Sequence, residues 1–122
     1  MGSEVEATNR IDHDMYGNQQ RLATEEVQDL RREGGRWLRD LREARGLSQR
    51  QMAILIGAEY YTLVSQIETG RGRVPPDRYL SWASALDVDP SVFVRDLMRF
   101  YDPITHGILF KTDAAPAVAA QP

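Results

Sequence analysis

The sequence predicts an all-α fold, and two kinds of observation support this prediction. Apolar residues recur at intervals of three and four along several segments, the spacing that places them on one side of a helix. Residues that favour helix starts precede these segments, and glycine follows several of them. A chain of 122 residues can form one small domain with appendages. We therefore expect a compact five-helix domain, with a short extra helix before it and an arm after it.

The composition excludes several kinds of site. The chain has no cysteine, which rules out disulfides, thiolate metal sites and cysteine nucleophiles. No apolar run approaches the length of a membrane span, and no signal-peptide pattern is present. We expect a cytoplasmic protein that does not bind membranes.

The charge is distributed unevenly, although the net charge is only -3. Residues 1–30 carry two Arg and seven acidic residues, and residues 74–122 carry four basic and six acidic residues. Residues 31–73, in contrast, carry nine Arg and five acidic residues. Because arginine is suited to bidentate pairing with phosphate, this distribution favours a nucleic-acid partner for the middle of the chain.

Residues 1–21 are polar and lack a sustained period, so we expect them to be disordered. Asp12, His13 and Asp14 are adjacent in this segment but have no fourth ligand, and we predict no metal site there. We also expect no other cofactor. An enzyme is unexpected as well, because no nucleophile has an evident base and no phosphate-cradling glycine motif is present.

Two helices are predicted on either side of a glycine pair. Residues 22–33 form a short helix with Thr24 as its cap. Gly34 and Gly35 are expected to break the chain before a second helix at residues 36–45, and this break opens a domain that we place at residues 34–102. The second helix directs four residues toward the core: Trp37, Leu38, Leu41 and Ala44.

The next helix has clear boundaries. Ser48 and Gln51 form a capping box, which satisfies two amides at a helix start. The helix therefore begins at Gln49, and it ends at Gly57, which can adopt the left-handed conformation. Its inward arc comprises Met52, Ala53, Leu55 and Ile56.

A further helix is predicted from Tyr60 to Thr69, closed by Gly70. A step of about 100° per residue separates its two faces. The inward face holds Tyr60, Leu63, Val64 and Ile67. The outward face holds mainly small polar groups: Tyr61, Thr62, Ser65, Gln66 and Thr69. Two short helices joined by a tight turn make a helix-turn-helix candidate.

Two more helices complete the predicted domain. Pro75 and Pro76 favour a helix start, and a core-facing stripe follows: Tyr79, Trp82, Ala83 and Leu86. Asp89 and Pro90 have the character of a cap and a first helical residue, and they open a last helix that ends near Tyr101.

The last helix has two apolar stripes, and a single chain can bury only one of them. The first stripe comprises Phe93, Leu97 and Phe100. The second comprises Val94, Met98 and Tyr101. We predict that a two-fold partner covers the second stripe, because most small oligomers are C2 dimers. Within residues 103–122, predicted to be an arm and a disordered tail, one apolar run would add a strand or arm to the contact: Ile108, Leu109 and Phe110. The alternative is a tail packed on its own chain.

The middle of the chain resembles a known family. The stretches LREARGLSQRQMA, IG and SQIETGRGRVPP are similar to the helix-turn-helix of the Cro and phage-repressor family, also called the xenobiotic-response-element (XRE) family of bacterial regulators. The similarity covers roughly residues 37–94 and implies a lambda-repressor-like DNA-binding domain. It rests on positions that agree together: Arg42, Leu47, Ser48, Gln49, Ala53, Gly57, Ile67, Glu68 and Gly70. The segment from Gly57 to Glu68 is one residue longer than is usual in the family. The resemblance therefore does not identify which side chain leads into the DNA groove.

The resemblance implies roles for individual residues. Base reading falls on four outward side chains: Tyr61, Thr62, Ser65 and Gln66. Gln can pair with adenine, while the Thr methyl or the Tyr ring can contact a thymine methyl. The resemblance also implies an ion pair between Arg42 and Glu68, and a phosphate contact by Gln49. Three arginines flank the unit, and we expect them to clamp phosphates: Arg50, Arg71 and Arg73.

Ile54 and Leu55 depart from the family, which more often has charged residues at these positions. We expect another surface to cover them. The helix at residues 22–33 either covers them or docks on a partner protein.

The implied function is that of a dimeric transcriptional repressor, which reads an inverted repeat in double-stranded DNA on the bacterial nucleoid. Two alternatives stay open. One is a DNA-binding antitoxin whose N-terminal or C-terminal extension neutralises a toxin. The other is a regulatory module of the same fold that binds only protein.

Overall fold

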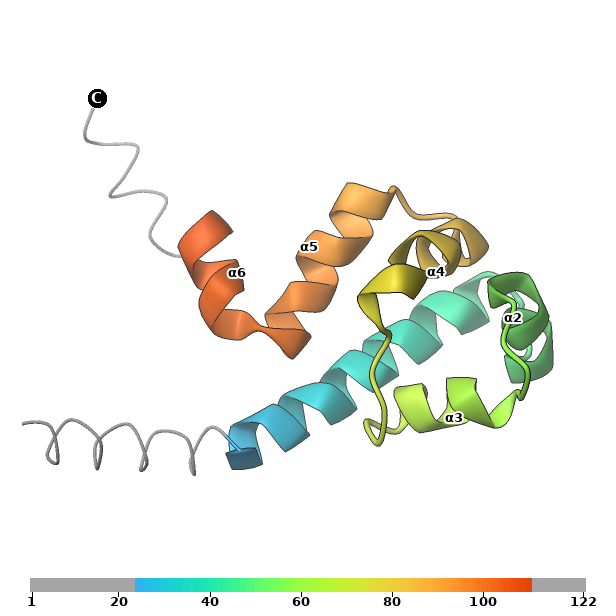
Figure 1. The fold of residues 1–122 in the computed structure, drawn as a ribbon, viewed down its shortest axis with the longest axis horizontal. Coiled ribbons are helices and arrows are strands. Elements are labelled where there is room, and N and C mark those ends of the chain that lie inside the picture. The colour runs from blue at the N-terminus through green and yellow to red at the C-terminus, as the bar shows by residue number, and fades with distance from the viewer. Residues whose placement is uncertain (1–23, 111–122) are drawn as a thin grey trace, which may run out of the picture.

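The computed structural model describes residues 24–110, and the regular elements in this part of the chain are all helical (Figure 1). The first helix occupies residues 24–44, starting from the first residue described. The following elements are α2 (Gln49–Ile56), α3 (Thr62–Glu68), the 3-10 helix η1 (Pro76–Arg78), α4 (Tyr79–Leu86), α5 (Pro90–Tyr101) and α6 (Pro103–Phe110). The all-α class is therefore confirmed for the described residues.

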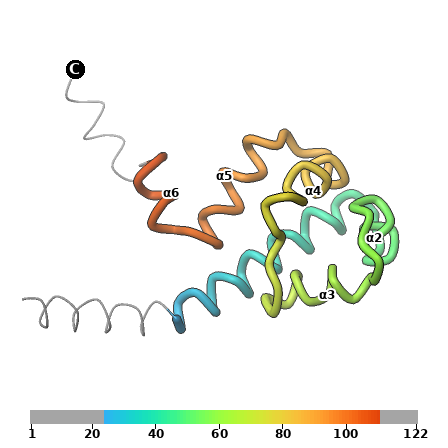
Figure 2. The backbone as a smooth tube through the Cα atoms, in the orientation of Figure 1, coloured from blue at the N-terminus to red at the C-terminus, as the bar shows by residue number. Residues whose placement is uncertain are grey.

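The core lies around the C-terminal part of the first helix. In Figure 2, α2, α3 and α4 gather around this part, while the N-terminal part extends away from them. The Trp37 ring lies 5.8 Å from the Phe93 ring and 5.6 Å from the Phe100 ring, which ties the first helix to α5. The largest fully buried side chains are Trp82, Phe93, Leu38, Met52, Ile67, Leu97, Val64 and Val74.

The predicted break at Gly34 and Gly35 is wrong, because both residues lie inside one continuous helix. An added Cβ on Gly34 would lie 2.8 Å from the Phe100 Cβ, and one on Gly35 would lie 2.2 Å from the Glu68 carbonyl oxygen. The glycines thus allow the helix to pass close to α5 and α3. This packing offsets a helix propensity that is lower than that of Ala by about 1 kcal/mol for each glycine. Residues 24–33 continue the first helix and are not a separate one.

The predicted strand or arm after α5 is also a helix. Pro103 opens α6, and the side-chain carboxylate of Asp102 accepts a hydrogen bond from the Thr105 amide at 3.1 Å. These two features are the same kind of proline and capping signal that starts other helices. The tails at residues 1–21 and 113–122, including Asp12, His13 and Asp14, lie outside the described residues.

Three residues predicted to face the core are exposed. Tyr60 precedes α3, which starts at Thr62, and it is 69% exposed because the connection after α2 carries it out of the helix. Ala44 is the last residue of the first helix and is exposed. Leu55 lies beside Ile54 on the outer side of α2, and both are exposed. No described element covers this pair, so the proposed cover by residues 24–33 is wrong.

The capping signals of α2 and α5 are confirmed. At α2, Ser48 Oγ accepts from the Gln51 amide at 3.1 Å, and Gln51 Oε1 accepts from the Ser48 amide at 2.8 Å. At α5, Asp89 accepts from the Ser91 and Val92 amides at 3.1 and 3.2 Å. Hydrogen bonds from the Ser91 hydroxyl and the Val92 amide lower the pKa of the Asp89 carboxyl.

Candidate nucleic-acid interface

Helix α3, which carries most of the predicted base-reading residues, is held by its inward face. Val64 and Ile67 are fully buried in the core, and α3 packs against α2. Gly57 ends α2 in the left-handed conformation, with φ 72°. From η1, Arg78 Nη1 donates a hydrogen bond to the Ile56 carbonyl at 2.6 Å, which satisfies a terminal carbonyl of α2. The two helices therefore form one rigid pair.

The four predicted base-reading residues lie together at the outer surface of this pair. Tyr61 is the N-cap of α3, and Thr62 is its first residue. Tyr61, Thr62 and Gln66 are exposed, and Ser65 is half-buried. Thr69 belongs to the same surface, but its hydroxyl donates to the carbonyls of Ser65 and Gln66 and is thus engaged in ending the helix.

The predicted ion pair joins α3 to the first helix. Arg42 Nε lies 2.6 Å from Glu68 Oε2, and Arg42 Nη2 lies 3.0 Å from Glu68 Oε1, so the contact is bidentate. Both side chains are buried. Arg42 Nη1 also donates to the Leu47 carbonyl at 2.6 Å. The hydrogen bond with Glu68 raises the pKa of the Arg42 guanidinium, despite the opposing effect of burial.

Gln49 belongs to the same network. Its Nε2 donates to Glu68 Oε1 at 3.1 Å, and the side chain is half-buried. The predicted role of Gln49 was a phosphate contact only, and this hydrogen bond was not predicted. The two residues are far apart in the chain, so no local pattern could have indicated their contact.

The predicted phosphate-binding arginines lie at both ends of α3. The Arg50 guanidinium lies over the Tyr61 ring, 4.9 Å from its centroid, near the start of the helix. Arg71 and Arg73 follow the end of the helix and are both exposed. The Arg73 guanidinium lies 4.8 Å from the Tyr101 ring centroid, so part of its surface packs against the domain.

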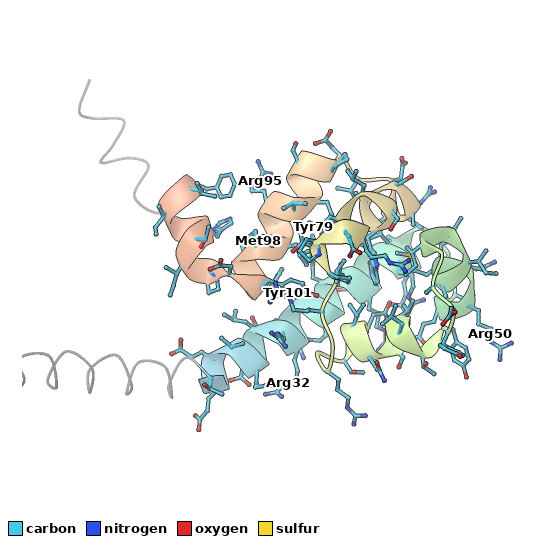
Figure 3. The ribbon with its side chains drawn as sticks, in the orientation of Figure 1. Arg32, Arg50, Tyr79, Arg95, Met98 and Tyr101 are labelled. Atoms are coloured by element: carbon cyan, nitrogen blue, oxygen red, sulfur yellow. The ribbon has the colours of Figure 1, made fainter. Side chains whose placement is uncertain are left out.

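Arg32 is a basic residue near α3 that was not among the predicted phosphate-binding residues. An added Cβ on Gly70 would lie 2.9 Å from the Arg32 backbone nitrogen, so the loop after α3 touches the first helix here. In the view of Figure 3, Arg32 and Arg50 lie on either side of α3. Arg32 forms an exposed ion pair with Asp29. The predicted glycine break had assigned Arg32 to a separate helix, which hid this proximity.

The residues predicted to form a dimer interface differ in their environments. Tyr101 is only 9% exposed, and its hydroxyl accepts a hydrogen bond from the Val74 amide at 3.0 Å. Burial raises the pKa of this hydroxyl. Tyr101 therefore packs inside its own chain and is not on a free face. Val94 and Met98 are half-buried against the core, while three residues of α6 are exposed: Ile108, Leu109 and Phe110.

Two further observations concern residues 24–110. In this range, no group of three His, Asp or Glu side chains is arranged to hold a metal ion. None of the helices in the same range has the length and apolar character needed to cross a membrane.

Comparison with known proteins places the helix-turn-helix in a family. A family model described as a helix-turn-helix domain matches residues 34–101, more than half of the chain. Among solved structures, the chain is similar to the restriction-modification controller protein C.AhdI from Aeromonas hydrophila. The identity is 38%, the match covers 53% of this chain and 96% of that chain, and the TM-score is 0.47. No curated protein sequence matches. As the resemblance to the XRE regulators had indicated, the chain belongs to the helix-turn-helix domain family of DNA-binding transcriptional regulators.

Proposed function

We propose that this chain is a dimeric repressor that recognises an inverted-repeat operator through the major groove of double-stranded DNA. The observation that carries this proposal is the construction of α3. Its outer surface presents a cluster of polar groups, while its last residue, Glu68, is fixed by a buried bidentate contact to Arg42. A rigid helix with a free polar surface is what reading base edges requires.

The side chains on α3 match the chemistry of the major groove. Gln66 can form a bidentate contact with adenine, and Ser65 can donate to or accept from either base pair. The Thr62 methyl and the Tyr61 ring can contact thymine methyl groups. These contacts would select the operator sequence.

Phosphate contacts would fix the position of α3 on the duplex. Arg50 lies near the start of the helix, and Arg71 and Arg73 lie after its end. Gln49 stands at the first turn of α2, where its free backbone amide could receive a phosphate oxygen. This arrangement surrounds the reading surface with groups that bind DNA of any sequence.

The remaining apolar surface supports a dimer. Val94 and Met98 of α5 are only half-buried, and α6 exposes Ile108 and Leu109, which are 63% and 66% exposed. Together with Phe110, these residues would form a two-fold contact. Two reading helices would then enter successive major grooves, at half-sites about 10 bp apart. Occupation of a promoter by this dimer on the nucleoid, in the bacterial cytoplasm, would block transcription.

A regulatory module that also binds protein is a second candidate, favoured by Ile54 and Leu55. These two apolar side chains are 77% and 54% exposed on the outer side of α2, where they are free to dock on another protein. Ile54→Ser would weaken such a partner contact and leave operator binding unchanged.

Base reading is tested with the double variant Ser65→Ala and Gln66→Ala. We expect reduced discrimination between operator and random DNA, because groups that contact base edges are lost. Arg71→Ala is the matched variant, since loss of a phosphate contact should weaken binding to both DNAs and reduce the salt slope by about one unit. The operator is first obtained by sequencing the DNA that co-precipitates with the tagged protein. Equal loss on both DNAs for the double variant would contradict base reading.

Dimerisation is tested with Met98→Glu. A carboxylate at this half-buried position of α5 would be desolvated in a two-fold contact, so we expect sedimentation to report monomers. The matched change Leu80→Glu places the same charge on the exposed side of α4 and should leave the mass unchanged. A dimer that persists in the Met98 variant would exclude α5 from the interface.

A further inference from the structure

A cleft between α5 and α6 lies apart from the reading surface. It has a volume of about 520 Å³ and is lined by Arg95, Asp96, Arg99, His106 and Phe110. Three of these residues come from α5 and two from α6. Figure 3 shows the Arg95 side chain extending from α5 on the side that faces α6. The cleft therefore joins two helices that are consecutive in the chain.

His106 contributes an imidazole to this cleft. His106 is only 8% exposed. Its imidazole forms no hydrogen bond with the other described residues. The imidazole ring lies 4.9 Å from the Phe110 ring, a contact that satisfies neither ring nitrogen. Its ring nitrogens are not enclosed by the protein, since Trp82 Nε1 is the one buried side-chain polar atom without a partner among the described residues. They are therefore open to the cleft that His106 lines, where a bound ligand could accept a hydrogen bond from the ring.

The charges around His106 favour an anion. Arg95 and Arg99 are four residues apart, so they lie on the same side of α5. Arg95 contacts Asp96 at 3.5 Å, which compensates one of the two positive charges. The Arg99 guanidinium lies over the Phe100 ring at 5.4 Å, and within residues 24–110 it forms no ion pair. The guanidinium has only hydrogen-bond donors to offer, and the imidazole has at least one.

We propose that the cleft binds a small anion through carboxylate or phosphate oxygens, held by Arg95, Arg99 and the imidazole of His106. Such an anion would join α5 to α6 by charge-assisted hydrogen bonds. It would thereby fix the position of α6 and of its exposed residues Ile108 and Leu109. If these residues form the dimer contact, a point that rests on the proposed function, the anion would also strengthen DNA binding by favouring the dimer.

The proposal is tested on the full chain without DNA, so its outcome does not depend on the proposed function. Inorganic phosphate and sodium acetate are titrated separately, at an ionic strength held constant with sodium chloride, and NMR follows the His106 ring and the Arg99 Nε. We expect saturable shifts of both signals, with the tighter anion identifying phosphate or carboxylate as the preferred class. Shifts no larger than those caused by sodium chloride would overturn the proposal.

Three variants separate binding from packing. Arg99→Gln should weaken the anion about tenfold or more, because it removes a charge-assisted hydrogen bond. Arg39→Gln removes the same charge at an exposed site outside the cleft and should leave affinity unchanged. His106→Phe keeps a ring against Phe110 but removes both nitrogens, so anion binding should fall while the thermal midpoint without anion is maintained. Equal affinity in the Arg99 and Arg39 variants would refute the site.

Discussion

Glu68 connects three helices, and its removal therefore has a large expected effect. It accepts hydrogen bonds from Arg42 Nε and Nη2 at 2.6 and 3.0 Å, and from Gln49 Nε2 at 3.1 Å. In Glu68→Ala, the buried Arg42 would keep only its hydrogen bond to the Leu47 carbonyl. The variant would thus leave a buried positive charge without a counter-ion.

The magnitude follows from this loss. Breaking a buried ion pair by removing one partner costs about 3–5 kcal/mol, against a total stability of about 5–15 kcal/mol for a domain. Glu68→Ala should therefore lose roughly a fifth or more of the free energy of unfolding. Gln49→Ala removes one hydrogen bond from a half-buried donor and should cost about 1 kcal/mol. The expected order is thus a large effect for Glu68 and a small one for Gln49.

Urea unfolding at one protein concentration measures these differences, since a dimer makes apparent stability depend on concentration. The control is the double variant Arg42→Met and Glu68→Leu, which removes both charges and keeps similar volumes. Replacement of a buried pair by apolar residues is often nearly neutral, so the double variant should be more stable than Glu68→Ala. A loss of stability below about 1 kcal/mol for Glu68→Ala would refute the reasoning. It would also be refuted if the double variant lost as much stability as Arg42→Met and Glu68→Leu lose in total when each is made alone.

The pH dependence of this pair has a definite sign. The hydrogen bond with Glu68 raises the pKa of Arg42 above its ordinary value. A pKa that is higher in the folded state gives stability that is fully present below the unfolded pKa and is lost as pH rises through the folded one. The contribution of Arg42 to the free energy of unfolding should therefore be constant between about pH 6 and pH 9. The stability lost in Glu68→Ala should be the same at these two pH values.

Two further predictions concern packing and a buried hydroxyl. Gly35→Ala should destabilise the fold by about 1–3 kcal/mol, because the new Cβ has no space against α3. Gly107→Ala is the control, since Gly107 also lies in a helix but has no atom within 4 Å of the new Cβ. This change should stabilise the fold by about 0.5–1 kcal/mol. If thermal unfolding showed a stability change of the same sign for both variants, the packing role of Gly35 would be contradicted. Tyr101→Phe should cost about 1–3 kcal/mol, since the Val74 amide loses its acceptor. Burial raises the pKa of Tyr101 above 10.0, so the wild type should lose stability above about pH 10. Tyr101→Phe should lack that loss. If urea unfolding gave parallel stability profiles for the wild type and the variant at alkaline pH, this role of the Tyr101 hydroxyl would be contradicted.

The elements that could be predicted from the sequence are those with local boundary signals. The capping box of Ser48 and Gln51 fixed the start of α2, and Asp89 with Pro90 fixed the start of α5. Such signals act within four residues, so they can be read from a short stretch of chain. The contact between Arg42 and Glu68 spans 26 positions, and only the resemblance to a known family could indicate it.

The errors arose where a distant contact determined the local structure. Gly34 and Gly35 have low helix propensity, and a local reading of them as a break is reasonable. Their contacts with Phe100 and Glu68 reverse that conclusion, since close approach requires the absence of a side chain. The prediction that the helix begins at Tyr60 was wrong for a related reason, because the length of the connection after α2 decides whether Tyr60 is helical.

The position of Gln49 bears on how DNA-binding measurements should be interpreted. Because its side-chain amide donates a hydrogen bond to Glu68, substitution of Gln49 would disturb the support of α3 even if the side chain never touches DNA. A fall in affinity alone therefore cannot identify a phosphate contact at this position. The salt dependence separates the two roles, since loss of one phosphate contact reduces the slope of log K against log salt by about 0.9. Loss of support for α3 would instead lower affinity at an unchanged slope and would reduce discrimination between operator and random DNA.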